Sequence, residues 1–396
     1  MRVGLFSNAY KPVVSGVVNS LVEIRKNLLK RRHTPFLFAP EVRGYRDCHA
    51  GVFRFPSLDL DKTVGFPVPI PYSAKLARLV PRMGLELIHS HHPILIGASA
   101  AKFSQKLNIP LVYTFHTQIE QYTHYVPFFS HKTVRDAARN KVSRYLARCE
   151  VVICPSSSIR GLIDSYGVDT RVEVIPNAID LSKFQQAQEP KRDLRTELGL
   201  SSQSLITLSV GRLATEKGLP FMLKVFARLS EKLDHHLVLV GDGPQRPELI
   251  ALRAALGLQD RVHFLGYIPY DRMPELYAQV DLFAICSTTE VKPLVVLEAL
   301  ASGVPVLAVS ACGTVDTLHH GEDGLLTGLD QAEYEAAWNS LLQSPSFRTK
   351  LSEGARRTAR LYSIDTYTDR LCWLYQEAVE SHRVRSLNRA ESRRDL

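Results

Sequence analysis

Residues 282–309, LFAICSTTEVKPLVVLEALASGVPVLAV, predict one complete strand–loop–helix–strand unit. The apolar run Leu282–Ile285 predicts a buried strand, and residues 304–309 predict a second one. Between them lies a short apolar segment that predicts a helix, with Gly303 as its C-terminal cap. Two strands joined by a crossover helix are typical of a parallel sheet.

The same stretch carries two carboxylates eight positions apart, Glu290 and Glu298. Glu290 lies in the loop after the first strand, and Glu298 lies inside the predicted helix. A carboxylate among Leu, Val and Ala is costly to bury unless donors reach it. A glutamate that reaches solvent or an arginine is the structural alternative, and the segment alone leaves both open.

The strand–helix theme repeats along the chain. In the first half, strands are predicted at 3–7, 34–39, 87–90, 111–114, 151–155 and 172–175, with helices at 17–32, 94–107, 132–148 and 157–166. In the second half, strands are predicted at 205–210, 237–240, 262–265, 282–285 and 304–309. This alternation predicts an α/β fold of two doubly wound sheets, with ligands at the carboxyl ends of strands in a cleft between the domains.

The predicted organisation has four parts. Residues 1–182 form the first domain, and residues 183–362 form the second, after a polar linker near residues 185–192. Residues 363–381 form a helix that packs back toward the first domain. Residues 382–396 form an Arg-rich, frayed tail.

Composition narrows the class of protein. A chain of 396 residues with 45% hydrophobic and 22% charged residues is long enough for two cores and typical of globular proteins. A net charge of +9 favours an anionic partner: phosphate groups, nucleic acid or an acidic membrane surface. The six cysteines form no Cys-x-x-Cys pair, and no apolar run is long enough to span a bilayer, so we expect a reduced, cytoplasmic protein.

Two glycine-rich turns follow predicted strands of the second half. Arg212 and Lys217 lie in the first turn beside a helix start, which suits a diphosphate, although solvated surface charges are the alternative. Gly241 begins the second turn, where a nucleotide is able to approach the backbone. In the first half, Gly16 begins a helix after the first strand.

Histidines follow two strands of the first half. His116 ends a buried strand, where it can donate to a phosphate or a sugar hydroxyl, although a purely structural histidine is the commoner outcome. His89, His91 and His92 raise a metal alternative, but no carboxylate or cysteine partner accompanies them. No metal site is predicted.

Together these motifs resemble the retaining group 1 (family 4) glycosyltransferases, which have the GT-B fold of two Rossmann-like domains. The resemblance rests on Gly211-Arg212-(x4)-Lys217-Gly218, Gly241-Asp242-Gly243-Pro244 and Glu290-(x7)-Glu298 in this order. It extends to Val174–Asp180 and Gly321–Leu326, and so covers nearly the whole chain. Residues 114–125 are similar to bacterial diacylglycerol glucosyltransferases.

The resemblance implies roles for individual residues. Arg212 and Lys217 would bind the donor diphosphate, Glu298 the ribose, and Glu290 the sugar hydroxyls. His116 would contact the sugar and the leaving phosphate. The implied catalytic set is His116, Arg212, Lys217 and Glu290, and the implied donor-binding set is Gly16, Arg212, Lys217, Gly241, Ile268, Glu290, Lys292, Leu294 and Glu298. No bound cofactor or metal is required, and the product keeps the anomeric configuration of the donor.

One position departs from the family pattern, because Pro293 stands where relatives usually have glycine. In those relatives backbone N–H groups here hold sugar hydroxyls, and proline has none. The sugar is therefore open, and Lys292 is the alternative donor to it.

An aromatic and basic segment supports a lipid acceptor at an anionic membrane surface. The residues in question are Tyr122, Tyr125, Phe128, Phe129, Lys132, Arg135 and Arg139. The preferred pair is UDP-glucose and diacylglycerol, with the enzyme peripherally bound at the inner face of the cell membrane. A sulfoquinovose or mannose donor and a phosphatidylinositol or soluble sugar acceptor remain open.

Three other classes fit less well. A glycoside hydrolase has no use for a diphosphate site. A dinucleotide-dependent oxidoreductase would carry Gly-x-Gly-x-x-Gly after the first strand, and this chain does not. A nucleic-acid-binding protein would fit the charge, but no recognition module is present.

Overall fold

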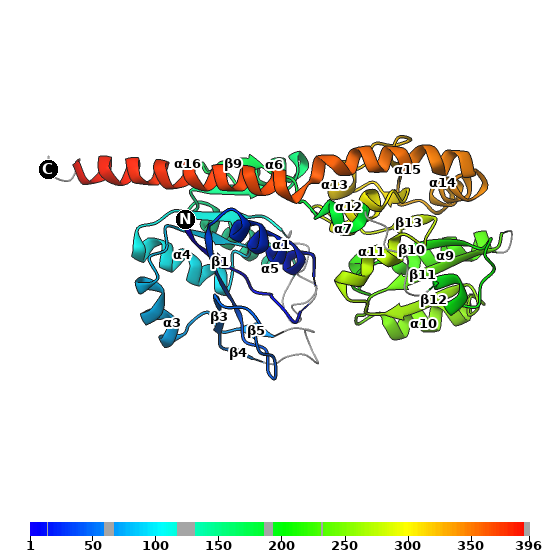
Figure 1. The fold of residues 1–396 in the computed structure, drawn as a ribbon, viewed down its shortest axis with the longest axis horizontal. Helices are drawn as coiled ribbons and strands as arrows, with labels where there is room; N and C mark the ends of the chain where they lie inside the picture. Colours follow the sequence, from blue (N-terminus) through cyan, green and yellow to red (C-terminus); the bar gives the residue numbers. More distant parts are fainter. Residues whose placement is uncertain (14, 59–66, 117–130, 186–192, 231–232, 392–396) are drawn as a thin grey trace. The chain divides into compact units, whose positions relative to one another are not determined.

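The computed structural model describes residues 1–13, 15–58, 67–116, 131–185, 193–230 and 233–391. Over these residues the chain forms two compact units (Figure 1). The first unit holds Met1–Asn177 together with Ile364–Leu396, and the second holds Ala178–Ser363. Each unit is built around its own parallel sheet.

The described part of the first unit contains a seven-stranded parallel sheet with the order β3-β2-β1-β6-β7-β8-β9. Its strands are β1 (Arg2–Phe6), β2 (Thr34–Pro40), β3 (Val52–Phe55), β6 (Leu87–Ser90), β7 (Leu111–Thr114), β8 (Val151–Cys154) and β9 (Arg171–Val174). The α-helices within residues 1–177 of this unit are α1 (Gly16–Lys30), α3 (Ala74–Leu79), α4 (Ile96–Leu107), α5 (His131–Leu146) and α6 (Ser157–Asp164). The short strands β4 (Ser57–Leu58) and β5 (Val68–Pro69) form a separate antiparallel pair.

The last helix, α16 (Ile364–Glu391), belongs to the first unit. Its buried side chains recur at helical spacing, which gives the helix one apolar face. Among these side chains are Ile364, Tyr367, Leu371, Leu374, Tyr375 and Ala378. Arg31, at the end of α1, forms ion pairs with Asp365 and Asp369 of α16. Apolar burial and ion pairs therefore both fix α16 to this unit.

The described part of the second unit contains a six-stranded parallel sheet with the order β12-β11-β10-β13-β14-β15. Its strands are β10 (Leu205–Val210), β11 (His235–Val240), β12 (Val262–Gly266), β13 (Leu282–Ile285), β14 (Val306–Val309) and β15 (Gly324–Thr327). Its α-helices are α7 (Leu181–Gln185), α8 (Leu194–Glu197), α9 (Leu219–Ser230), α10 (Arg246–Ala255), α11 (Met273–Tyr277), α12 (Leu294–Ser302), α13 (Cys312–Val315), α14 (Gln331–Gln343) and α15 (Pro345–Ala359). Short 3-10 turns are η3 (Thr215–Lys217), η4 (Tyr270–Arg272) and η5 (Arg360–Tyr362).

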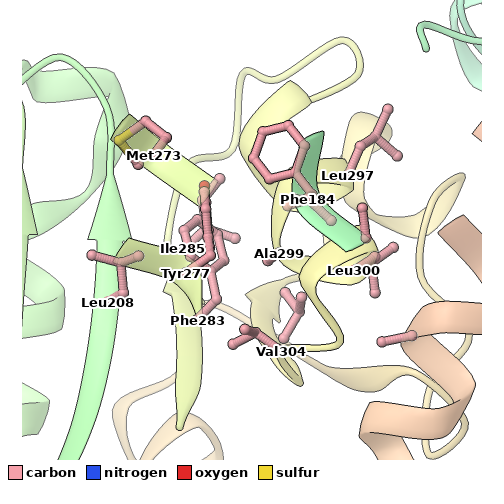
Figure 2. Packing of buried hydrophobic residues seen from close by; sticks show 14 of the residues in the cluster. Phe184, Leu208, Met273, Tyr277, Phe283, Ile285, Leu297, Ala299, Leu300 and Val304 are labelled. Atoms are coloured by element: carbon pink, nitrogen blue, oxygen red, sulfur yellow. The ribbon is translucent and has the colours of Figure 1, made fainter. Parts of the chain in front are cut away.

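Strand residues of the second unit alternate between two apolar cores, because successive side chains of a strand point to opposite faces. Leu208 and Phe283 pack in a core that includes residues of α11 and α12 (Figure 2). Leu282 and Ala284 belong to the other core, together with Trp338 of α14. Burial on both faces explains why these strands are continuous apolar runs.

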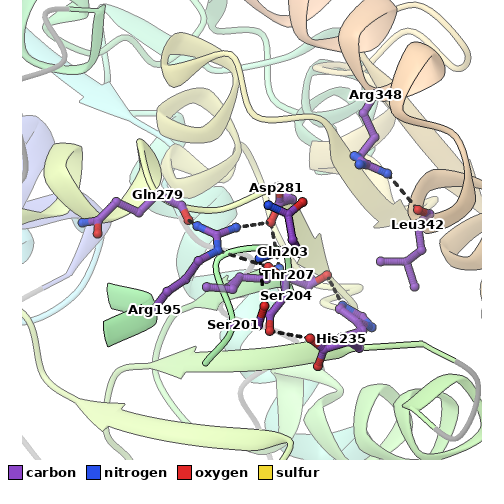
Figure 3. Close-up of polar contacts among 12 residues, drawn as sticks. Arg195, Ser201, Gln203, Ser204, Thr207, His235, Gln279, Asp281, Leu342 and Arg348 are labelled. Carbon is purple, nitrogen blue, oxygen red and sulfur yellow. Dashed lines mark hydrogen bonds and ion pairs between the residues drawn. The ribbon is translucent and has the colours of Figure 1, made fainter. Parts of the chain in front are cut away.

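The amino edge of the second sheet is held by an arginine (Figure 3). Arg195 of α8 donates to the carbonyl of Gln279 at 2.9 Å and to the carboxylate of Asp281 at 2.8 Å. Asp281 also accepts the backbone N–H of Ile206 at 2.8 Å. These contacts are structural, and the residues predicted to bind ligand lie at the opposite, carboxyl edge.

All the predicted strands are present in the described residues, and the differences are additional strands and shifted strand ends. The strands β3, β4, β5 and β15 were not predicted, and of these β4 and β5 are only two residues long, too short to show a repeating pattern. Gly324 begins β15, and a Cβ there would lie 2.4 Å from the carbonyl oxygen of Val306, so close strand packing requires the glycine. The strand β14 begins at Val306 instead of residue 304, since Pro305 has no N–H to donate.

The boundaries also differ from the prediction. The chain enters the second unit after Asn177 instead of residue 182, because Ile179 is buried in the core of that unit. The predicted linker at 185–192 lies almost entirely outside the described residues. The helix predicted over 363–381 continues to Glu391. The prediction of a frayed tail is therefore wrong for residues 382–391. Arg385 forms an ion pair with Glu150, which supports the extra turns. In the described residues, no helix has the length and hydropathy to cross a membrane.

Candidate active site

The residues predicted to bind phosphate lie where the strand order of the second sheet reverses. The strands β10 and β13 are neighbours, and their connections leave toward opposite sides of the sheet. Such a switch point leaves an opening at the carboxyl ends of the strands. Lys217, in the turn after β10, forms an ion pair with Glu290, in the loop after β13. A pocket at this edge is lined by Ser209, Val210, Gly211, Arg212, Leu213, Lys217, Leu219, Leu239, Val240 and Ile285.

Two glycine turns interlock beside this pocket. A Cβ on Gly241 would lie 2.0 Å from the carbonyl oxygen of Gly211, and one on Gly243 would lie 2.4 Å from that of Leu213. The N–H of Gly211 donates to Val240 at 2.9 Å. Because the turns touch backbone to backbone, Gly241 is needed first for packing, and its predicted contact with the donor stays a prediction.

The ion pair is held by the backbone around it. Gly218 ends η3 with φ of +64°, and a Cβ there would lie 2.8 Å from the carbonyl oxygen of Cys286. Ser287 donates from Oγ to the carbonyl of Glu216 at 3.0 Å. The Lys217 and Glu290 side chains are 25% and 19% exposed, so both remain within reach of a ligand.

Glu298 is buried in α12, with 3% of its surface exposed. The hydroxyl of Tyr277 in α11 donates to its Oε2 at 3.0 Å. Burial raises the pKa of the Glu298 carboxyl to about 7, against the opposing effect of the Tyr277 hydrogen bond. The sequence left open whether Glu298 is buried or reaches solvent or an arginine. In the structure it is buried, and its described hydrogen-bond partner is Tyr277. Sequence reasoning missed Tyr277, which no motif indicates.

Lys292 does not point to solvent either. Its Nζ donates to the carbonyl oxygen of Asp316 at 2.8 Å and to the hydroxyl of Tyr362 at 3.1 Å. The following Pro293 is the N-cap of α12, with φ of −72° that suits proline. Leu294, the first residue of α12, is buried, and Ile268 is half-buried after β12.

Four histidines gather at the carboxyl edge of the first sheet. Nδ1 of His91 is hydrogen-bonded to Nε2 of His116 at 2.9 Å. His89 bonds through Nδ1 to the Tyr375 hydroxyl at 2.6 Å and through Nε2 to Thr114 at 2.7 Å. Burial lowers the pKa of His89 and His116 to about 3 and that of His92 to about 4, so these rings are neutral near pH 7.

The remaining hydrogen bonds of the cluster join it to the rest of the first unit, except at Nε2 of His91, which is buried without a partner in the described part of the chain. Nδ1 of His92 accepts the backbone N–H of Asn8 at 3.1 Å, so His89, His91 and His92 have separate partners. Among the described residues, no group of three or more His, Cys, Asp or Glu side chains is arranged to hold a metal ion.

Comparison with known proteins decides the family. Residues 190–358 match the family described as Glycosyl transferases group 1, and residues 14–183 match Glycosyltransferase Family 4. The alpha-monoglucosyldiacylglycerol synthase of Streptococcus pneumoniae R6 is 33% identical over 316 residues, which span 78% of this chain and 71% of that protein. The chain is a group 1 glycosyltransferase.

Other similar proteins differ in their named activity. A protein of Salinispora tropica named D-inositol 3-phosphate glycosyltransferase is 32% identical over 326 residues, 76% of this chain and 65% of that protein. The structure of Anabaena Alr3699/HepE in complex with UDP-glucose is similar with a TM-score of 0.77 at 23% identity, over 95% of this chain and 100% of that one. The glycosyltransferase therefore has the predicted GT-B fold of two Rossmann-like domains.

Most of the residues predicted to contact lipid lie outside the part of the chain that the structure describes. Tyr122, Tyr125, Phe128 and Phe129 fall outside the described residues, and the side chain of Lys132 is likewise not described. Arg135 of the glycosyltransferase is exposed on α5. Arg139 donates to Ser165 and stacks over the ring of Tyr166 at 4.8 Å, so part of its surface serves packing. Their role at a membrane stays a prediction.

Gly16 is the first residue of α1 in the glycosyltransferase and is exposed. The N-cap Ser15 accepts the N–H of Val18 at 3.3 Å, which closes the first turn of the helix. The approach of Gly16 to the donor stays a prediction.

Proposed function

We propose that this glycosyltransferase moves glucose from UDP-glucose to diacylglycerol with retention of the anomeric configuration. The observation that carries the donor half is the ion pair of Lys217 and Glu290 across the switch point of the second sheet. It brings a cation for phosphate and a carboxylate for sugar hydroxyls to one edge. Arg212 lines the pocket beside this pair and supplies a second cation.

The proposed catalysis is electrostatic. Breaking the sugar–phosphate bond gathers negative charge on the nucleoside diphosphate and positive charge on the sugar ring. Cations at Arg212 and Lys217 then stabilise the transition state more than the ground state. The departing phosphate oxygen accepts the proton of the acceptor hydroxyl on the same face of the sugar, so the mechanism needs no protein nucleophile. Trapping of a covalent sugar–Glu290 adduct would contradict this route.

The acceptor half rests on similarity and charge. The Streptococcus pneumoniae relative is named for a diacylglycerol product. In this chain, Arg135, Lys141, Arg144 and Arg148 give the described part of α5 and the residues after it an exposed basic surface. Such a surface suits an anionic membrane, where about 1 kcal/mol per basic residue is available. We therefore place the enzyme peripherally at the inner membrane face.

A single product assay tests both halves. The protein is incubated with UDP-glucose, UDP-sulfoquinovose or GDP-mannose, and with anionic vesicles that contain diacylglycerol or phosphatidylinositol, or with soluble sugars. We expect an α-glucosyl diacylglycerol from UDP-glucose, and none from vesicles without diacylglycerol. Glu290→Gln serves as the matched inactive protein. Transfer only to soluble sugars would contradict the lipid acceptor, and transfer only from another donor would contradict UDP-glucose.

A further inference from the structure

Lys292 presents an unusual buried charge. Its surface is 6% exposed, and its Nζ lies 4.4 Å from the centre of the Tyr362 ring as well as within hydrogen-bond distance of that hydroxyl. Burial lowers the pKa of the ammonium to about 8, while Asp316 acts in the opposite direction. Burying an ammonium is costly, and a methionine would fill similar space without that cost. The charge is therefore expected to do something that apolar packing would not.

One end of this contact lies where the chain leaves the second unit. Tyr362 ends η5, one residue before the unit ends at Ser363. Its carbonyl accepts the N–H of Ile179 at 3.0 Å, and Ile179 pairs with Ser363 as an isolated β-bridge. The segment that enters the second unit and the segment that leaves it are thus fastened together at Tyr362.

The other end lies in the loop that carries Glu290. A Cβ on Gly313 of α13 would lie 2.6 Å from the carbonyl oxygen of Glu290, so α13 packs directly against this loop. Lys292 binds the carbonyl of Asp316, the C-cap of the same helix. The loop therefore contacts α13 at Glu290 and at Lys292. Lys292 also donates to the hydroxyl of Tyr362.

We propose that Lys292 is a positioning residue, which fixes the Glu290 loop onto α13 and couples it to the fastened segments at Ile179 and Tyr362. It acts on the sugar through Glu290 and does not touch the sugar itself, in contrast to the direct contact expected from the sequence. This assignment rests on the proposed function only where it assigns the sugar to Glu290.

Hydrogen exchange of the full chain tests the coupling without any ligand. Lys292→Met keeps an unbranched side chain that lacks only the terminal ammonium group, and so removes the donors. Tyr362→Phe keeps the ring and removes the hydroxyl. Lys350→Met on the exposed surface of α15 is the matched control. We expect Lys292→Met to speed exchange about tenfold in peptides covering both 178–182 and 287–297, because both lose a shared restraint. Tyr362→Phe is expected to do the same to a smaller extent, and Lys350→Met to change neither. Faster exchange in 287–297 alone, or in neither peptide, would overturn the proposal.

Ligand affinity supplies the second readout. Lys292→Met is expected to weaken UDP-glucose binding about tenfold and to leave UDP binding within about twofold, because the phosphate residues keep their places. An equal loss for both ligands would overturn the selective role. If the unaltered protein binds neither ligand, the donor proposal fails, while the exchange experiment still decides the role of Lys292. If Lys292→Met does not fold, Tyr362→Phe carries both measurements.

Discussion

The two units share one architecture but differ in the chemistry at the carboxyl edges of their sheets. The second unit places opposite charges there, Lys217 and Glu290, beside Arg212. The first unit places histidines there, and His116 and His89 are neutral because burial lowers their pKa to about 3. Among the residues that the structure describes, the edge of the second sheet thus carries an ion pair, and the edge of the first sheet carries uncharged imidazole rings.

Exposure explains the difference. The Lys217 and Glu290 side chains keep about a fifth to a quarter of their surface in solvent, so their charges persist and are available to a ligand. His89 has no exposed surface and is enclosed by Thr114 and Tyr375. We infer that the second unit supplies the charge that a diphosphate needs, whereas the described histidines at the edge of the first sheet offer neutral donors and acceptors.

The strongest test of this contrast removes a charge from the second unit. Lys217→Met is expected to lower kcat roughly a hundred- to a thousand-fold, or about 3–4 kcal/mol, since it removes stabilisation of the departing diphosphate. Steady-state transfer from UDP-glucose measures the effect. Lys224→Met, on an exposed position of α9, is the matched control and is expected to keep full activity. Equal rates for both variants would remove Lys217 from the mechanism.

The next test addresses the interlocked turns that carry the charges. Gly241→Ala adds a Cβ that would lie 2.0 Å from the Gly211 carbonyl oxygen, at a φ of +128°. Overpacking and backbone strain together are expected to cost about 2–4 kcal/mol of unfolding free energy. Gly257→Ala, with φ of +67° and nothing within 4 Å, carries the strain alone and should lose about 1 kcal/mol. Urea unfolding compares the two, and equal losses would show that the contact is relieved.

The sequence predicts which charged residues gather at the edge of the second sheet better than it predicts the buried partners of Glu298 and Lys292. Arg212 and Lys217 lie in the turn after β10, and Glu290 lies in the loop after β13, so strand order and turn chemistry place them at one edge. Tyr277 reaches Glu298 from 21 positions away on another helix, and no local pattern encodes such a partner. The same holds for Tyr362 and Lys292, which meet only after both elements pack.

Glu298 is the exception in the second unit, because it is buried like the histidines. Its pKa is raised from the ordinary 4.5 to about 7 in the fold. The stability contributed by the neutral carboxyl is therefore lost as pH rises from 4.5 to 7, and the loss is complete above pH 7. The family resemblance predicts that Glu298 holds the ribose, whose hydroxyls would donate to the ionised form. On that prediction, UDP-glucose affinity is expected to rise about tenfold from pH 6 to pH 8. The phosphates of UDP-glucose do not titrate in this range.

Glu298→Gln removes the titration at nearly constant volume. Its affinity for UDP-glucose is expected to be flat over the same range and about tenfold weaker than that of the unaltered protein at pH 8. Calorimetric titrations at three pH values provide the measurement. An unchanged pH profile in the variant would assign the titration to another group.

The smallest effect tests the neutral edge. The pKa of His89 is lowered from 6.5 to about 3 in the fold, so the unfolded chain binds more protons between these values. The stability contributed by the neutral ring is complete above pH 6.5 and is lost as pH falls. When the pH is lowered from 6.5 to 5.5, the unfolding free energy of both proteins is expected to fall. The fall in the His89→Gln variant should be about 1 kcal/mol smaller than in the unaltered protein. Urea midpoints at both pH values measure it. Parallel losses would mean that folding does not lower the pKa of His89, and the contrast between a charged and a neutral sheet edge would then disappear.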